Sequence, residues 1–123
     1  YRFDKMCQED SQNHYWCIQD KQNQQFVGLI SLDEYHNADE IEVSYQLSPV
    51  WYGIGIGTEV VGAVLDYGLS QLGLRSIVAE TQTANVSSCK LLERVGMVRE
   101  QTVERFGAMQ AVYRINKITD SSK

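Results

Sequence analysis

A glycine-rich segment is the part of this sequence whose residue types and spacing most directly suggest chemistry. Three glycines stand on alternate positions in the run Tyr52-Gly53-Ile54-Gly55-Ile56-Gly57-Thr58-Glu59. The run lies between a strand-like segment, 41–47, and a helix-like segment, 58–72. A turn of this kind exposes backbone N–H groups at the start of a helix, where these donors and the helix dipole favour phosphate-type anions. The segment therefore predicts a site for a pyrophosphate-bearing cofactor.

The residues that follow the glycines separate this run from two common phosphate-binding loops. A P-loop requires a Lys and a Ser or Thr after its last glycine, but Thr58 and Glu59 follow Gly57. A dinucleotide fingerprint requires G-x-G-x-x-G, yet Thr58 or Val60 stands where the third glycine belongs. What remains is x-x-G-x-G, the pattern that holds the pyrophosphate of coenzyme A. The alternative is a glycine-rich turn that merely lets a helix and a strand pack closely.

The elements around this turn alternate between strand and helix patterns. Apolar residues at three- and four-residue spacing predict helices over 58–72 and 86–95, and each of these helices ends at a glycine. The expected strands cover residues 15–19, 25–32, 41–47, 75–81, 97–105 and 110–115. The predicted fold is thus α/β (an α+β mixed sheet) in the order β-β-β-α-β-α-β-β, with turns at 20–24 and 34–39. The strand–helix–strand unit over 41–81 implies a right-handed crossover, with the glycine turn at the ligand-binding end of its strand.

Composition and charge limit the class of partner. The 123 residues, 43% of them hydrophobic, suffice for one domain over 1–123, and a net charge of −5 argues against nucleic acid. No apolar run could cross a bilayer and no signal peptide is evident, so a cytoplasmic protein without a membrane partner is expected. The three cysteines and two histidines are scattered, which favours reduced thiols and no metal.

The charges are distributed unevenly along the chain. Residues 1–50 contain nine acidic and three basic side chains, a net charge of −6, whereas residues 51–123 contain seven acidic and eight basic ones, a net charge of +1. An acidic half beside a phosphate-binding half would suit a cationic co-substrate that meets an anionic cofactor. The alternative is that the acidic residues simply keep surface loops soluble.

Three motifs occur in a fixed order along the chain. They are Glu42-Val43-Ser44-Tyr45-Gln46-Leu47 with Pro49 after it, the run from Tyr52 to Glu59, and Asn85-Val86-Ser87-Ser88 followed by Leu91-Leu92-Glu93-Arg94-Val95-Gly96-Met97. These motifs and their separations resemble the GNAT superfamily of acetyl-CoA-dependent N-acetyltransferases. Within it they are most similar to the branch that contains the ribosomal-protein N-terminal acetyltransferases, whose motifs read E-I-G-Y-W-L-x-P, W-G-K-G-Y-A-T-E and N-x-x-S with L-L-E-K-L-G-F.

The chain also departs from the family pattern. Family members usually begin with a further strand and a helix pair, which are missing or only partly present before Tyr15, so an N-terminally incomplete domain is expected. Part of the acceptor groove would then be missing, unless a partner chain, such as the second copy in a homodimer, supplies the residues that complete it. The superfamily often has Gln or Arg where Tyr52 stands, which removes one polar side chain near the pyrophosphate.

The resemblance implies acetyl-CoA as co-substrate and an amine as acceptor. The residues expected to hold the cofactor are Gln46, Leu47, Tyr52, Gly53, Ile54, Gly55, Ile56, Gly57, Thr58 and Asn85. Backbone groups of Gln46 and Leu47 would pair with pantetheine, the N–H groups of 53–58 would hold the pyrophosphate, and Asn85 would bond the pantetheine amides. Asn85 is also in position to cap the second helix, and both roles are compatible.

Two residues are the expected catalytic groups. The acceptor amine must lose a proton, because an alkylammonium has a pKa of about 10. Glu42 is the candidate base, acting through water, since it lies on the strand that leads to the glycine turn and on the face opposite Val43; the alternative is a solvated strand glutamate. Ser88 is the candidate for bonding or protonating the coenzyme A sulfur, because the family's usual Tyr position is Leu92 here; the alternative is a first-turn hydroxyl.

The sequence thus predicts an N-acetyltransferase that moves an acetyl group from acetyl-CoA to a primary amine, by direct attack in a ternary complex. A protein N-terminus and a small amine are the expected acceptors. Two alternatives stay open: a non-catalytic coenzyme A-binding or regulatory module, and a transferase for a longer acyl donor.

Overall fold

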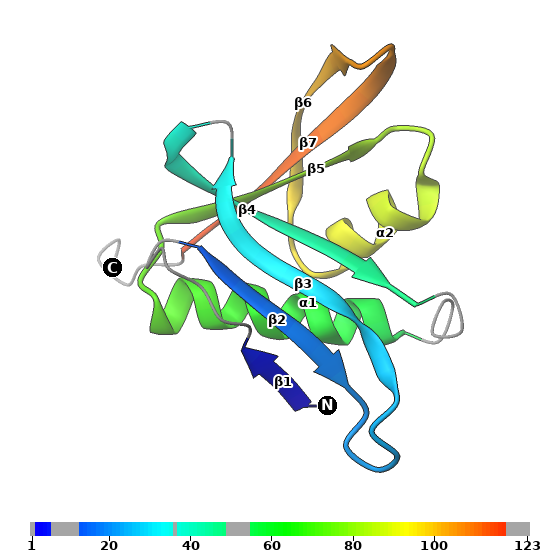
Figure 1. Ribbon diagram of the computed structural model, residues 1–123. Coiled ribbons are helices and arrows are strands. Elements are labelled where there is room, and N and C mark those ends of the chain that lie inside the picture. The colour runs from blue at the N-terminus through cyan, green and yellow to red at the C-terminus, as the bar shows by residue number, and fades with distance from the viewer. Residues whose placement is uncertain (1, 6–12, 36, 49–54, 118–123) are drawn as a thin grey trace.

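A single mixed sheet organises the chain (Figure 1). The computed structural model describes residues 2–5, 13–35, 37–48 and 55–117. Its strands are β1 (Arg2–Lys5), β2 (His14–Gln19), β3 (Phe26–Tyr35), β4 (Asn37–Leu47), β5 (Ser76–Gln82), β6 (Val98–Arg105) and β7 (Ala108–Asn116). They lie in the order β1-β2-β3-β4-β5-β7-β6, where β4 and β5 are parallel and every other neighbouring pair is antiparallel.

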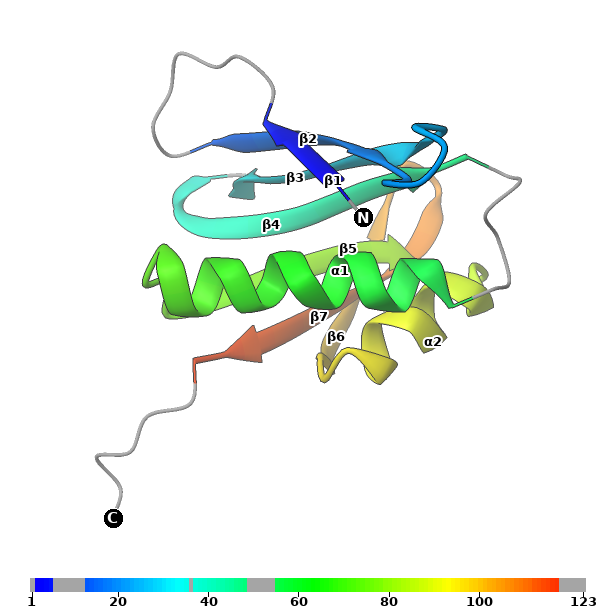
Figure 2. The ribbon, with the colours of Figure 1, turned by 90° about the horizontal axis from the view of Figure 1, so that it is seen from below.

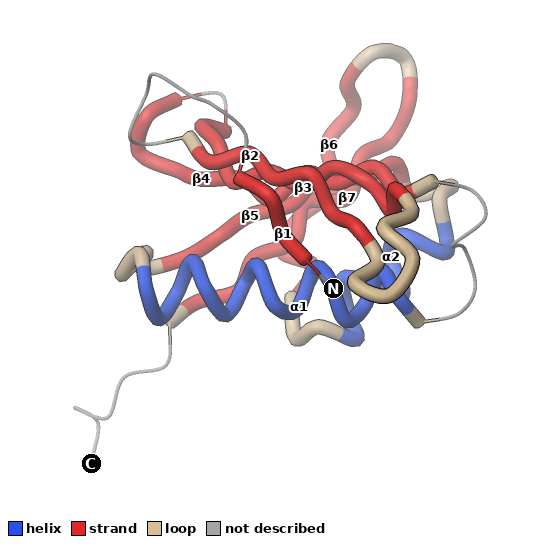
Figure 3. The backbone as a smooth tube through the Cα atoms, turned by 60° about the horizontal axis from the view of Figure 1, so that its bottom comes forward, coloured by secondary structure: helices blue, strands red, loops and turns tan. Residues whose placement is uncertain are grey.

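The helices are α1 (Ile56–Asp66) and α2 (Val86–Arg94), and both lie on the same side of the sheet, as Figure 2 and Figure 3 show. A π-helical segment, Tyr67–Gln71, continues α1, with the Leu72 N–H bonded to the Tyr67 carbonyl at 3.1 Å. One cluster of buried side chains joins the helices to the sheet. Its members include Ile18, Ile30, Leu32, Val43, Val60, Val61, Val64, Leu65, Ile77, Ala79, Leu92 and Tyr113.

The predicted fold class and element order are confirmed from β2 onward, and the structure adds β1 before them. The predicted turn at 34–39 is wrong, because β3 runs to Tyr35 and β4 begins at Asn37. The antiparallel ladder continues into this segment, where Glu34 pairs with Ile41. The predicted helix over 58–72 is one helical stretch that begins earlier, at Ile56, and whose end winds as a π-helix.

Tyr113 of β7 connects α2 to the sheet. Its ring is fully buried on β7, and its hydroxyl donates to Glu93 of α2 at 2.8 Å. The same hydroxyl accepts two bonds from the Arg99 guanidinium on β6, at 3.2 Å and 3.0 Å. Buried hydroxyls require such partners, because an unbonded one would lose its hydration without compensation. The bonds therefore hold the last turn of α2 against the sheet.

Gly28 lets β4 approach β3 closely at the end that leads to the glycine turn. It lies opposite Leu47 in the antiparallel ladder. A Cβ atom at this position would lie 2.4 Å from the carbonyl oxygen of Gln46 and 3.0 Å from the Cα of Leu47. Both contacts are with backbone, so the strand itself would have to move to relieve them. Gly28 therefore sets the path of β4 through residues 46 and 47.

Gly28→Ala is expected to destabilise the fold by about 1–3 kcal/mol, because the added methyl overpacks a backbone contact. Chemical denaturation of both proteins measures the loss. Gly62→Ala is the matched control: its Cβ would meet Val95 Cγ1 at 3.8 Å, within α1, so a gain of about 0.5–1 kcal/mol is expected. Equal effects of the two substitutions would contradict this account.

Candidate functional site

The parting of β4 from β5 opens a cleft. Their parallel ladder contains a single pairing, between Glu42 and Val78. Beyond that pair, residues 43–47 of β4 and 79–81 of β5 line a cavity of about 700 Å³. The β5-facing edge of β4 is thereby open to a ligand, since an extended ligand can bond such an edge as an added strand.

The cavity is lined by four elements: β4, the start of α1, the end of β5, and α2 along its length. Its lining residues are Val43, Ser44, Tyr45, Gln46, Leu47, Gly55, Gly57, Thr58, Ala79, Glu80, Thr81, Asn85, Ser87, Ser88, Lys90, Leu91, Leu92 and Arg94. Seven predicted site residues are among them, namely Gln46, Leu47, Gly55, Gly57, Thr58, Asn85 and Ser88. The structure thus brings together segments that are up to about forty residues apart in the sequence.

The remaining five predicted residues are not among the described lining residues. The side chain of Ile56 is 4% exposed and belongs to the core, so its side chain is not part of the cavity wall. Tyr52, Gly53 and Ile54 lie outside the described residues. Glu42 stands at the point where the strands part rather than among the lining residues.

The two described glycines of the turn have different structural roles. Gly55 precedes α1 with φ 80°, a left-handed conformation that favours glycine, and no atom lies within 4 Å of a Cβ placed there. Gly57 is buried, and its Cβ would lie 2.5 Å from Leu91 Cδ1 and 3.2 Å from Leu47 Cδ1. The close packing that was the alternative interpretation is therefore present at Gly57, at the N-terminus of a helix that borders the cavity.

The first turn of α2 presents a hydroxyl pair. The Asn85 side chain accepts from the backbone N–H of Ser88 at 3.1 Å, which is the expected helix cap. The Ser88 hydroxyl in turn lies 2.6 Å from the Tyr45 hydroxyl on β4. Burial raises the pKa of Tyr45, so its phenol is protonated at neutral pH and able to donate to Ser88.

Tyr45 is a residue that the sequence reasoning missed as a functional group. Strand alternation places it with Val43 on the helix side of the sheet, and no functional role was predicted for it. That side is also where α2 begins, and the long side chain of Tyr45 reaches Ser88 across 43 positions of sequence. Lys90 and Arg94, one turn apart on α2, also line the cavity and were not predicted; their positive charge suits phosphate groups.

Glu42 lies on the sheet face opposite the helices, half-buried between neighbouring carboxylates. Burial is the main cause that raises its pKa to about 7, and the charges of Asp33 and Glu80 add to the shift. The backbone N–H of Glu80 and the charge of Arg105 oppose it. A solvated glutamate does not fit this environment. A carboxylate that titrates near neutrality suits a general base.

Two further observations concern metals and membranes. Among the described residues, no three His, Cys, Asp or Glu side chains are grouped so as to hold a metal ion. Within the same part of the chain, no helix has the length and apolar character needed to cross a membrane.

Comparison with known proteins decides the family. A family model described as an acetyltransferase (GNAT) domain matches residues 2–98. The chain belongs to the GNAT family. Among relatives of this GNAT chain is the uncharacterised N-acetyltransferase YoaA of Bacillus subtilis, 30% identical over 94 residues, which cover 74% of the chain and 52% of YoaA. The chain spans about half the length of the curated relatives that it matches.

Solved GNAT structures share the fold. Spermidine N-acetyltransferase of Vibrio cholerae, in complex with CoA and spermine, is 22% identical with a TM-score of 0.78, over 87% of this chain and 67% of that one. Ribosomal-protein-S5-alanine acetyltransferase of Vibrio fischeri is 20% identical with a TM-score of 0.78, over 86% and 62%. The resemblance of the three motifs to the GNAT superfamily is thereby confirmed.

The raised pKa of Glu42 predicts a pH dependence of stability. The native carboxyl holds its proton up to about pH 7, whereas in the unfolded chain it releases the proton near its ordinary value of 4.5. The free energy of unfolding should therefore fall as pH rises between these two values, because the folded state binds more protons there.

Urea denaturation at several pH values between 4.5 and 8 measures this fall. Glu42→Gln should flatten the curve over that window, whereas Glu104→Gln, which alters an exposed carboxylate on β6, should leave it unchanged. Parallel curves for wild type and Glu42→Gln would show that Glu42 is not the group responsible.

Proposed function

We propose that this GNAT chain transfers an acetyl group from acetyl-CoA to a primary amine, a protein N-terminus or a small amine, by direct attack in a ternary complex. The observation that carries the proposal is the cleft between β4 and β5. Its lining includes residues from both faces of the sheet: Tyr45 and Ser88 on the helix side, and Ser44 and Glu80 on the side of Glu42. A thioester held on one side can therefore meet an amine that approaches from the other.

The cleft supports coenzyme A as the donor. The open edge of β4 at Gln46 and Leu47 suits pantetheine as an added strand. The start of α1 at Gly55, with Gly57 and Thr58, suits the pyrophosphate, to which Tyr52, Gly53 and Ile54 would contribute. Lys90 and Arg94 add positive charge on the opposite wall. Asn85 would then combine its capping role with contacts to the pantetheine arm.

The chemistry is assigned to residues on the two sides of the cleft. Glu42 accepts a proton from the acceptor ammonium, directly or through water, and the neutral amine attacks the thioester carbonyl. As the carbon–sulfur bond breaks, the nitrogen loses its second proton, which reaches the leaving thiolate through the Ser88 hydroxyl, and Tyr45 donates a hydrogen bond to Ser88. The thiolate is a fair leaving group, with a pKa of about 8.5, so this donation is helpful rather than obligatory.

The charge around Glu42 supports a cationic acceptor. Asp33, Glu42 and Glu80 lie on one face, and an ammonium group is attracted to such a surface before it loses its proton. The spermidine N-acetyltransferase with the same fold acts on an amine of this kind, which supports a small amine as acceptor. A protein N-terminus carries the same reacting group.

Thiol release from acetyl-CoA, measured with a panel of amines and N-terminal peptides, tests the proposal. Glu42→Gln is expected to lower kcat/KM by roughly 10²-fold or more without loss of the fold, because the general base is removed. Glu104→Gln serves as the control with the same charge change. Normal turnover in Glu42→Gln would exclude the base. Coenzyme A binding without thiol release for any amine would favour the non-catalytic module.

Tyr45→Phe and Ser88→Ala test the hydroxyl pair. If Tyr45 acts through Ser88, each change should lower kcat by about threefold to tenfold, and the double variant should be no slower than Ser88→Ala alone. The KM for acetyl-CoA should change little, since neither hydroxyl is assigned to binding. Effects of the two substitutions that multiply in the double variant would show that the hydroxyls act separately.

A further inference from the structure

Two other carboxylates on its sheet face, Asp33 and Glu80, lie close enough to act on Glu42. Asp33 of β3 is the ladder partner of Glu42, and Glu80 of β5 lies close enough for its charge and its backbone N–H to act on Glu42. Like charges that share one site cannot all ionise without cost. The carboxylate that holds a proton is therefore the one whose ionised form is stabilised least by hydrogen bonds and ion pairs.

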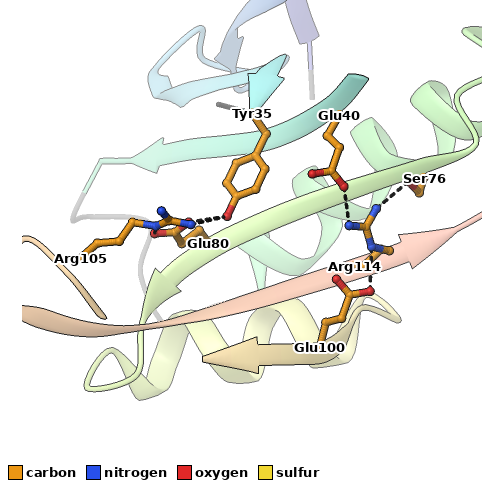
Figure 4. Close-up of polar contacts among 7 residues, drawn as sticks. All are labelled: Tyr35, Glu40, Ser76, Glu80, Glu100, Arg105 and Arg114. Carbon is orange, nitrogen blue, oxygen red and sulfur yellow. Dashed lines mark hydrogen bonds and ion pairs between the residues drawn. The ribbon is translucent and has the colours of Figure 1, made fainter. Parts of the chain in front are cut away.

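Glu80 is held by a closed ring of hydrogen bonds, shown in Figure 4. Its Oε1 accepts from the Tyr35 hydroxyl at 2.6 Å, and its Oε2 accepts from Arg105 Nε at 2.9 Å. Arg105 Nη2 closes the ring by donating to the Tyr35 oxygen at 3.2 Å. The side chain of Glu80 is 11% exposed, so these bonds form where water competes weakly. Both carboxylate oxygens of Glu80 are thus engaged.

The other two carboxylates have fewer side-chain contacts. Asp33 accepts from the Tyr15 hydroxyl at a long 3.5 Å. Within the described residues, no side chain donates a hydrogen bond to Glu42, which accepts from the backbone N–H of Glu80. Glu42 is also the carboxylate at the point where β4 and β5 part.

The ring draws its members from three separate parts of the fold. Tyr35 is the last residue of β3, Glu80 lies on β5, and Arg105 is the last residue of β6, before the turn into β7. In the sheet, β4 lies between β3 and β5, and β7 lies between β5 and β6. The ring therefore bridges over the strand that carries Glu42, and it holds Glu80 from both sides.

We propose that Tyr35, Glu80 and Arg105 form a positioning unit for Glu42: the ring occupies Glu80 and leaves Glu42 as the carboxylate that accepts the proton of the amine. This inference rests on the proposed function. None of the three ring residues is assigned to touch the reacting atoms. They act through the charge and the backbone that they place beside Glu42.

The charged groups that face Glu42 give opposite expectations for two members of the ring. Asp33 from β3 and Glu80 from β5 raise its pKa, whereas Arg105 from β6 lowers it; the helices lie on the other face. Removal of the Arg105 charge should therefore raise the pH at which Glu42 titrates. Removal of the Glu80 charge should lower it. A structural defect alone would not produce shifts of opposite sign.

The chain offers a matched control on the same face. Arg114 of β7 binds Glu40 at 2.5 Å, Glu100 at 2.8 Å and Ser76 at 2.9 Å, as Figure 4 shows beside the ring. It is an arginine in a comparable ion-pair network, yet neither it nor its carboxylate partners are among the groups that shift Glu42. Arg114→Met therefore also removes a guanidinium from an ion-pair network, but it should leave the pKa of Glu42 unchanged.

The test is the titration of the Glu42 side-chain carboxyl by ¹³C NMR, alongside kcat/KM for acetyl transfer as a function of pH. Arg105→Met is expected to move both midpoints upward by roughly half a pH unit, and Glu80→Gln to move them downward by a similar amount. Arg114→Met should leave them in place, and Arg105→Lys should recover most of the upward shift because it restores the charge. Shifts of the same sign in the first two variants, or none, would overturn the inference.

Failure of this inference and failure of the proposed function give different results. If Glu42→Gln abolishes turnover while Arg105→Met and Glu80→Gln leave the NMR midpoint unmoved, the function stands and the positioning unit is refuted. If the midpoints move as expected but Glu42→Gln turns over normally, Glu42 is not the base, and the inference falls with that assignment. Thermal unfolding of each variant confirms that the fold is retained, and Arg105→Lys keeps the test open should Arg105→Met not fold.

Discussion

The parallel contact between β4 and β5 ends after one residue pair, and the rest of the site depends on that ending. Had the ladder continued beyond Glu42 and Val78, the backbone groups of β4 would bond to β5 and the sheet would be closed. Instead the two strands diverge. Their divergence opens the cleft, which is bordered by the N-termini of both helices. Gly28 supports this path from the other side of β4, since no side chain there could coexist with the Gln46 carbonyl.

The cleft lies between the two faces of the sheet, which differ in chemistry. The helix face supplies hydroxyls, helix N-termini and the basic residues Lys90 and Arg94, all suited to an anionic donor. The opposite face supplies carboxylates, which suit a cationic acceptor and the removal of its proton. Because strand alternation places neighbouring residues on opposite faces, one short stretch of β4 presents Glu42 to one side and Tyr45 to the other. The residues proposed for the donor side and for the acceptor side thus lie within four positions of a single strand.

Much of this was predictable from local pattern. Period-2 alternation, helical spacing and the glycine run gave the fold class, the element order and the end of the sheet at which the cleft lies, and the three motifs indicated the family that the comparison confirmed. Glu42 and Ser88 could be proposed because each belongs to a short motif. The similarity to the ribosomal-protein N-terminal acetyltransferases also indicated Asn85, whose side chain caps α2 in the structure.

What could not be predicted depends on contacts between distant segments. The bond between Tyr45 and Ser88 spans 43 positions, and that between Arg105 and Tyr35 spans 70, so no spacing signals either. The extent of β3 to Tyr35 and of β4 from Asn37 was not predicted, because it depends on ladder partners that a local pattern does not identify. The side chain of Ile56 packs in the core, whereas the role predicted for its backbone N–H stays a prediction.

The contact at Gly57 ties together two walls of the cleft. A Cβ atom at this position would lie 2.5 Å from Leu91 Cδ1 of α2 and 3.2 Å from Leu47 Cδ1 of β4, so a larger residue would displace both side chains, and both line the cavity. At Gly55 no atom lies within 4 Å of such a Cβ, so a side chain there would meet neither wall. Of the two glycines, Gly57 is therefore the one through which a substitution would change the width of the cleft.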